Sequence, residues 1–175
     1  GGLTAQAARG GAELVALPEY FCLRGRRATD RRAAAEDDGR GPIQQMLADC
    51  ARRAAVWVVG GTLPMRTADP QRVRNSCCVY APDGRRVARY DKIHLFAYDN
   101  GSERYDEGRV LEAGDAPVAF EALGLRIGLS VCYDLRFPEL YRALGRPPCD
   151  LLCVPSSFTH TTGRAHWELL LRTRA

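Results

Sequence analysis

Two residues that could act as a base and a nucleophile lie at the ends of apolar stretches of the chain. Glu19 comes after ELVAL (residues 13–17), and Cys132 ends GLRIGLSVC (residues 124–132). Loops just past the carboxyl ends of buried strands are where α/β proteins place their sites. Apolar surroundings raise the pKa of a carboxyl group toward the range of a general base. A cysteine at a strand-to-helix turn faces a cleft beside free backbone N–H groups, so the sequence offers both a base and a nucleophile.

Lys92 is the only lysine of the chain, although lysine and arginine together number 25. The planar guanidinium group of arginine does not replace a compact ammonium group, so this lysine is a further candidate. Histidine is the usual base for a cysteine nucleophile. The positions of His94, His160 and His166 do not require a Cys–His pair. The residues alone therefore leave the ordinary alternatives open, namely an exposed glutamate and a structural buried cysteine.

Apolar runs alternate with helical patterns along the chain, which is typical of a single α/β domain. The sequence Pro-Asp-Gly at residues 82–84 predicts a hairpin turn. Two segments have little periodicity, and we expect residues 24–41 to form a solvated loop and residues 95–114 a long loop. Strands are predicted at residues 13–17, 56–61, 75–80, 85–90, 124–133 and 150–155, and helices at residues 3–9, from Pro42, from Pro138 and from Arg164.

The composition is that of an ordinary globular protein. The chain has 175 residues, of which 46% are hydrophobic and 26% charged. The net charge is only +4 and the arginines are scattered, so nucleic acid is not an expected partner. The apolar runs are far shorter than the roughly 20 residues of a membrane span, so a membrane is not an expected partner either.

The cysteines favour a reducing compartment. They number seven, two of them are adjacent, and no secretory segment is visible, so we expect a cytoplasmic protein without a disulfide framework. Cys149 and Cys153 lack the spacing of a zinc site, and the three histidines do not complete one. We therefore expect neither a metal nor another cofactor.

Three segments together resemble the nitrilase, or carbon–nitrogen hydrolase, superfamily. They are ALPEYF (residues 16–21), YDKIHLF (residues 90–96) and GLSVCYDLRFPELYR (residues 128–142), in the order and with the gaps of that family. The resemblance covers nearly the whole chain and is strongest to the branch of ω-amidases and deaminated-glutathione amidases. It implies an enzyme that hydrolyses a small amide and releases ammonia through a thioester. Nitrile hydrolysis, acyl transfer and a non-catalytic oligomerisation module remain alternatives.

The resemblance also implies a fold, the α-β-β-α sandwich of the nitrilase type. Residues 1–175 would form one hydrolase domain, expected to be a fragment that lacks the first strand and the C-terminal portion of the family. Family members form dimers that pack into longer stacks, so a homodimer or a larger homo-oligomer is expected. The substrate would be a small-molecule amide.

The family's catalytic residues map onto this sequence one by one. Glu19 corresponds to the general base, Lys92 to the lysine that stabilises the oxyanion, and Cys132 to the nucleophile. The second glutamate is placed at Glu107, although Gly108 follows it where the family usually has serine, so Glu103 and Glu112 stay open.

Further residues follow from the same resemblance. The lysine ammonium would lower the pKa of the cysteine and favour its thiolate form. The backbone N–H of Tyr133 would share the oxyanion with the lysine. Tyr20, Phe96, Phe158 and His166 are candidates for lining the pocket, with a place in the core as the alternative. Arg136 and Arg164 are candidates for binding a substrate carboxylate.

Overall fold

The computed structural model describes residues 1–23, 25, 28–102 and 104–175. In chain order, the elements are α1 (Gly2–Arg9), β1 (Leu14–Ala16), α2 (Ala28–Ala33), α3 (Pro42–Ala54), β2 (Trp57–Val59), β3 (Leu63–Arg66), β4 (Val73–Tyr80), β5 (Arg86–Asp91), β6 (Ala97–Asp99), β7 (Arg104–Asp106), η1 (Glu107–Arg109), β8 (Val118–Ala122), β9 (Leu125–Leu129), η2 (Cys132–Arg136), α4 (Pro138–Leu144), β10 (Leu151–Cys153) and α5 (His160–Arg174).

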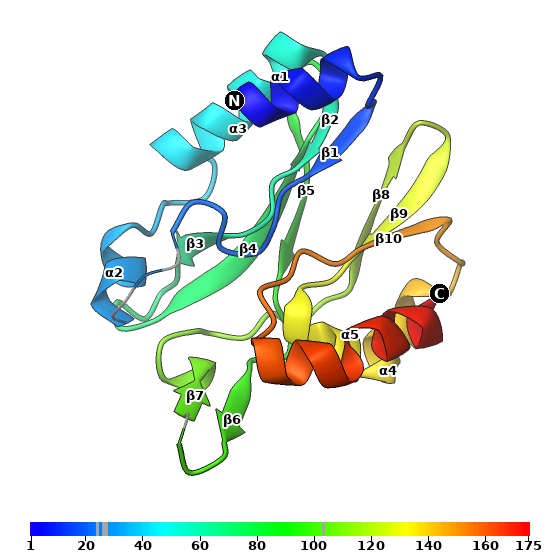
Figure 1. Ribbon diagram of the computed structural model, residues 1–175. Coiled ribbons are helices and arrows are strands. Elements are labelled where there is room, and N and C mark those ends of the chain that lie inside the picture. The colour runs from blue at the N-terminus through cyan, green and yellow to red at the C-terminus, as the bar shows by residue number, and fades with distance from the viewer. Residues whose placement is uncertain (24, 26–27, 103) are drawn as a thin grey trace.

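Two sheets face each other between two layers of helices (Figure 1). One sheet contains β1, β2, β4 and β3 in that order, and β5 also pairs with β4. The second sheet has the order β10-β9-β8. Helices α1 and α3 cover the outer face of the first sheet, and α4 and α5 cover the second. The predicted α-β-β-α sandwich is confirmed.

Strand β4 shows why the sequence forms these layers. Its side chains alternate between two cores, as those of a strand must. Cys77 and Val79 are buried between the two sheets, where they join Ile127 and Leu129 of β9. Cys78 and Tyr80 belong to the other core, beneath α3. A strand buried on both faces needs a continuous apolar run, and CCVY supplies it.

The segment of residues 24–41 is more ordered than expected, in the part of it that the structure describes. It contains α2, and Glu36 is 6% exposed. The Glu36 carboxylate accepts hydrogen bonds from the backbone N–H groups of Ile43 (2.5 Å) and Gln44 (3.1 Å), at the start of α3. The charged composition predicted a solvated loop, but this acidic side chain satisfies the first turn of a helix.

Residues 95–114 also contain structure that the sequence did not predict. Strands β6 and β7 pair as an antiparallel hairpin, and η1 follows directly. Each strand has only three residues and neither contains a buried residue, so no apolar alternation marks them. The hairpin projects below the sandwich in Figure 1 and leads the chain to Glu107.

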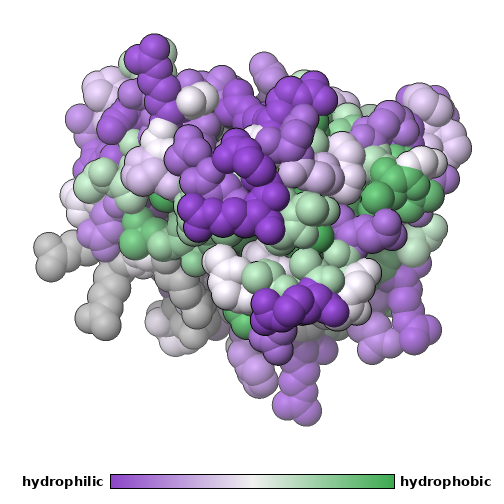
Figure 2. Space-filling view, turned by 90° about the horizontal axis from the view of Figure 1, so that it is seen from above, coloured by the Kyte–Doolittle hydropathy of each residue, from purple (hydrophilic) through white to green (hydrophobic). Residues whose placement is uncertain are grey.

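The outer surface is mostly polar on the side of α1 and α3. Figure 2 views the molecule from above and shows hydrophilic residues over most of this face, with a hydrophobic patch toward the right edge. None of the helices among the described residues is long and apolar enough to cross a membrane.

Candidate active site

Strand ends from both sheets deliver the candidate catalytic residues to one place. In the first sheet, β1 runs parallel to β2, and Glu19 lies three residues beyond its last residue. In the second sheet, β9 runs parallel to β10, and Cys132 follows β9 at the same distance. Lys92 is the first residue after β5. Carboxyl ends of parallel strands are open to a crevice, so both sheets can supply side chains to the same cavity.

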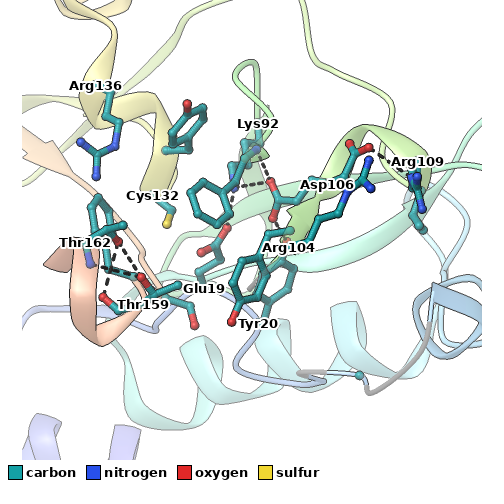
Figure 3. Close-up of a pocket in the computed structure, with 18 of the residues that line it drawn as sticks. Glu19, Tyr20, Lys92, Arg104, Asp106, Arg109, Cys132, Arg136, Thr159 and Thr162 are labelled. Carbon is teal, nitrogen blue, oxygen red and sulfur yellow. Dashed lines mark hydrogen bonds and ion pairs between the residues drawn. The ribbon is translucent and has the colours of Figure 1, made fainter. Parts of the chain in front are cut away.

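Lys92 lies between two carboxylates in the interior. Its Nζ is 3.0 Å from Oε1 of Glu19 and 2.8 Å from Oε2 of Glu107, and the lysine side chain is 1% exposed. The second oxygen of Glu107 accepts a hydrogen bond from the Tyr20 hydroxyl at 2.6 Å. The backbone N–H of Phe96 donates to Oε2 of the same glutamate at 2.8 Å. The lysine is therefore fixed in position, and Figure 3 shows it beside Glu19 and Cys132.

Cys132 sits in a strained turn at the start of η2. Its φ is +49°, a left-handed conformation that costs a non-glycine residue about 1–3 kcal/mol. Its backbone N–H donates to the carbonyl of Pro155 at 3.0 Å, which ties the turn to the segment after β10. Its thiol and the Glu19 carboxylate act on each other's pKa, and the backbone N–H of Ser157 acts on the pKa of the thiol, so these groups are neighbours. This turn directs the sulfur at the base.

Burial favours the protonated thiol of Cys132 in the resting site, while Lys92 acts in the expected direction, toward the thiolate. Burial raises the pKa of Cys132 well above its ordinary value, and the Glu19 carboxylate raises it further. Lys92 and the Ser157 N–H act in the opposite direction but are outweighed. The charge of Lys92 is also shared with two carboxylates.

The two glutamates differ in the direction of their pKa shifts. Burial raises the pKa of Glu19, and Glu107 adds to this while Lys92 opposes it. Burial also acts to raise the pKa of Glu107, but Lys92 and the hydrogen bonds to that carboxylate lower it overall. Burial alone would lower the pKa of Lys92, yet the two carboxylates raise it. The lysine is thus a fixed cation, Glu107 is its counter-ion, and Glu19 is the better proton acceptor.

These residues open into a cavity of about 750 Å³. On one side its wall carries Arg136, Thr159 and Thr162, and on the other it extends to Arg104 of β7 (Figure 3). Phe158 also lines it. The aromatic residues Tyr20, Phe96 and Tyr133 also line it. A cavity of this volume suits a small molecule.

Several residues expected from the sequence lie elsewhere. His166 is exposed on α5 and does not line the cavity; its Nδ1 is 3.4 Å from Nη1 of Arg136. Arg164 lines a separate, open depression next to α5. Glu112 is ion-paired with Arg74 at 2.8 Å, away from the lysine, and Glu103 lies outside the described residues. The structure therefore favours Glu107 as the second glutamate.

Two polar residues beside the site were not singled out from the sequence. Asn75 donates a hydrogen bond from Nδ2 to Oε1 of Glu19 at 3.0 Å, and it is 2% exposed. Asp134 is fully buried and accepts hydrogen bonds from Tyr90, His94 and Val131. An asparagine inside a buried strand is a signal that could have been used, because asparagine is depleted in strands.

The assembled groups suit acyl transfer to sulfur. A thiol, a carboxylate that accepts its proton and a fixed ammonium group surround one point at the cavity wall. Such a set can form and break a thioester by general acid–base and electrostatic catalysis. Within the described part of the chain, no three His, Cys, Asp or Glu side chains are grouped so that they could hold a metal ion.

Comparison with known proteins identifies the family. Residues 2–175 match the carbon–nitrogen hydrolase model, and the chain belongs to that family. It is 40% identical over 174 residues to a deaminated glutathione amidase of Yersinia enterocolitica, covering 94% of the chain and 58% of that relative. It is 37% identical to the omega-amidase NIT2 of Homo sapiens, covering 97% of the chain and 60% of that relative.

A solved structure agrees with this assignment. The NitFhit protein of C. elegans superimposes with a TM-score of 0.86 at 32% identity, over 98% of the chain and 42% of that protein. The resemblance to the nitrilase superfamily is therefore confirmed. The chain spans about three fifths of the length of the two amidases named above.

Proposed function

We propose that this protein is a cysteine-dependent amidase that releases ammonia from a small carboxylated amide. The observation that carries the proposal is the convergence of Glu19, Lys92 and Cys132 on one cavity wall, with Glu19 hydrogen-bonded to Lys92. The amidase activities named for the two relatives support the same reaction class.

In the first half of the reaction, the sulfur of Cys132 attacks the amide carbon while its proton passes to Glu19. The neutral resting thiol makes this proton transfer necessary. The carbonyl oxygen becomes an oxyanion next to Lys92 and the backbone N–H of Tyr133, in the first turn of η2. The C–N bond then breaks, Glu19 returns the proton to nitrogen, and ammonia leaves.

In the second half, water hydrolyses the thioester. Glu19 takes a proton from the water as its oxygen attacks the acyl carbon, and the same lysine stabilises the second oxyanion. The C–S bond breaks, the sulfur recovers a proton from Glu19, and the acid product is released. One carboxylate thus acts four times, which requires a pKa that lets it both accept and donate, as its raised value does.

Arg136 is the residue that we assign to a substrate carboxylate. It lines the cavity near Cys132 and is half-buried. Its Cζ lies 5.5 Å from the centre of the Phe158 ring. A guanidinium group binds a carboxylate through two parallel hydrogen bonds. We also propose a cytoplasmic location and a homo-oligomeric state for the whole protein.

The test of this function is the Cys132→Ala variant of the full-length protein. We expect ammonia release from small carboxylated amides such as ω-amides of dicarboxylic acids to fall to background, with an unchanged melting curve. Cys50→Ala, which removes a thiol on α3 outside the cavity, is the control and should keep full activity. Unchanged ammonia release in Cys132→Ala would refute the proposal. Nitriles and acyl acceptors assayed in parallel separate hydrolysis of amides from the related reactions.

A further inference from the structure

Asn75 is a buried polar residue that the proposed mechanism has not used. It lies in the first half of β4, opposite Pro64 of β3, and is 2% exposed. Its Oδ1 is buried and has no hydrogen-bond partner among the described residues. An unpaired carbonyl in the interior is unfavourable and rare in folded proteins, so its presence needs an explanation.

The amide nitrogen of the same side chain provides the explanation. Nδ2 of Asn75 donates to Oε1 of Glu19 at 3.0 Å, and Nζ of Lys92 donates to that same oxygen at 3.0 Å. The backbone carbonyl of Asn75 accepts the backbone N–H of Lys92, also at 3.0 Å. One residue therefore holds both the base and the lysine at fixed separation.

The two carboxylate oxygens of Glu19 differ in the hydrogen bonds that they accept from these two donors. Oε1 accepts from both nitrogen donors, so a proton on it would displace a hydrogen bond. Oε2 is the oxygen that these two donors leave, and the thiol of Cys132 lies beside the same carboxylate in the cavity wall. Donors on one oxygen of a carboxylate also favour its ionised form.

We propose that Asn75 is a positioning residue that reserves Oε2 of Glu19 as the proton acceptor for Cys132. This inference rests on the proposed function, because it concerns the base of that reaction. It assigns the residue no contact with substrate. The unpaired Oδ1 follows from the geometry, since the amide is turned to present its N–H to the carboxylate.

Asn75→Leu is the sharpest test because leucine has a similar size and removes the donor together with the unpaired carbonyl. Replacing a poorly satisfied polar group by an apolar one of the same shape need not destabilise the fold. We expect an unchanged or higher melting temperature, about a tenfold or greater fall in kcat and little change in KM. Loss of a donor raises the pKa of Glu19, so the acidic limb of the pH–rate profile should move to higher pH.

A second readout does not depend on the amide. Alkylation of Cys132 by iodoacetamide, followed by mass spectrometry across pH, also requires ionised Glu19 to accept the thiol proton. Its lower inflection should move to higher pH in Asn75→Leu and stay in place in Ser76→Ala, the control. Ser76 is the next residue of β4 and hydrogen-bonds to Asp91, outside the cavity. If no amide is hydrolysed, the proposed function fails while this shift still tests Asn75.

The same two measurements on Asn75→Ala keep the test valid if leucine is too bulky for the site and prevents folding. The proposal is overturned if kcat and the alkylation inflection of a folded variant equal those of the unchanged protein. It is equally overturned if activity falls only in proportion to the loss of folded protein, because Asn75 would then have a structural role alone.

Discussion

Lys92 illustrates at the scale of one residue why charge alone does not define the site. Its ammonium group contacts two carboxylates in a space where the side chain is 1% exposed. A planar guanidinium group has the same charge but is larger and directs its donors in a fixed plane. The position therefore requires a lysine, which agrees with its being the only one in a chain rich in arginine.

The corresponding prediction concerns Lys92→Arg. We expect kcat for amide hydrolysis to fall by about 100-fold or more, because the oxyanion loses a donor at the right distance. Steady-state kinetics of the folded variant measure this effect. Arg89→Lys, a change of the same type on β5 at a residue ion-paired with Asp91, should keep kcat within a few-fold. Retention of full activity by Lys92→Arg would contradict the role given to the ammonium group.

Glu107 gives a prediction for stability against pH. Its pKa lies below the ordinary value of 4.5 because Lys92 and several hydrogen bonds favour the carboxylate over the opposing effect of burial. A group whose pKa is lowered on folding stabilises the protein above its unfolded pKa and loses that contribution as the pH falls through the folded value. The stabilisation by Glu107 is therefore complete at pH 7 and declines below about pH 4.5.

We expect Glu107→Gln to reduce the free energy of unfolding at pH 7 by about 3 kcal/mol, because it removes one partner of a buried ion pair. The difference from the unchanged protein should shrink as the pH falls from 5 toward 3. Urea unfolding at several pH values measures it. A difference that stays constant over this range would show that the charge of Glu107 is not what stabilises the fold.

Sequence reasoning at this scale found the residues that resemble a family motif and missed those that only support them. Glu19, Lys92 and Cys132 lie in segments long enough to be recognised, and the structure brings them together. Asn75 and Asp134 act by contacts across 56 and 40 or more positions of the chain, which no local pattern encodes. Lys92 lowers the pKa of Cys132 as expected, but burial, which depends on the whole fold and was not foreseen, outweighs that one neighbouring charge.

At the scale of elements, apolar strands were predictable and short polar ones were not. Four strands fall within the predicted ranges, namely β1, β2, β9 and β10. Strand β4 begins two residues before its predicted range. Strand β8 was missed, as were β3 and the β6–β7 hairpin, because a proline or a charged residue interrupts each of their sequences, VAFEA, LPMR, AYD and RYD. Helix α5 begins at His160 rather than Arg164, since the side chain of Thr159 caps it by accepting from the N–H of Thr162.

The turn from β9 into η2 depends on a single buried carboxylate. Asp134 accepts hydrogen bonds from the Tyr90 hydroxyl at 2.7 Å and from the backbone N–H groups of Val131 at 2.8 Å and His94 at 2.9 Å. It also contacts Nδ1 of His94 at 2.7 Å. Both sheets are thus joined at the turn that carries Cys132, which holds that residue in its left-handed conformation.

We therefore expect Asp134→Ala to destabilise the fold by about 3 kcal/mol or more, because several buried donors lose their acceptor. Chemical denaturation measures the loss, and Asp150→Ala, at an exposed residue before β10, is the control. A variant of Asp134 that remains as stable as the unchanged protein would show that the turn is held by other contacts.

At the scale of the whole molecule, the helices of the outer layers differ in how completely they are buried. Helix α3 buries four residues against the first sheet, whereas α5 contains no buried residue although it spans 15 residues. Leu169 on α5 is 64% exposed. Packing of α5 on the second sheet is thus carried by half-buried side chains such as Trp167 and Leu170, whereas α4 in the same layer buries Leu140, Tyr141 and Leu144. The proposed homo-oligomer would cover this side.

The last prediction tests that assembly. If α5 lies at a contact between copies, Leu169→Glu places a charge in an apolar interface and should shift the full-length protein toward a lighter species at a given concentration. Sedimentation velocity measures the shift. Leu3→Glu is the matched control, because Leu3 is 81% exposed on α1, in the opposite outer layer, and its replacement should leave the distribution unchanged. An equal effect of both variants, or of neither, would place the contact between copies away from α5.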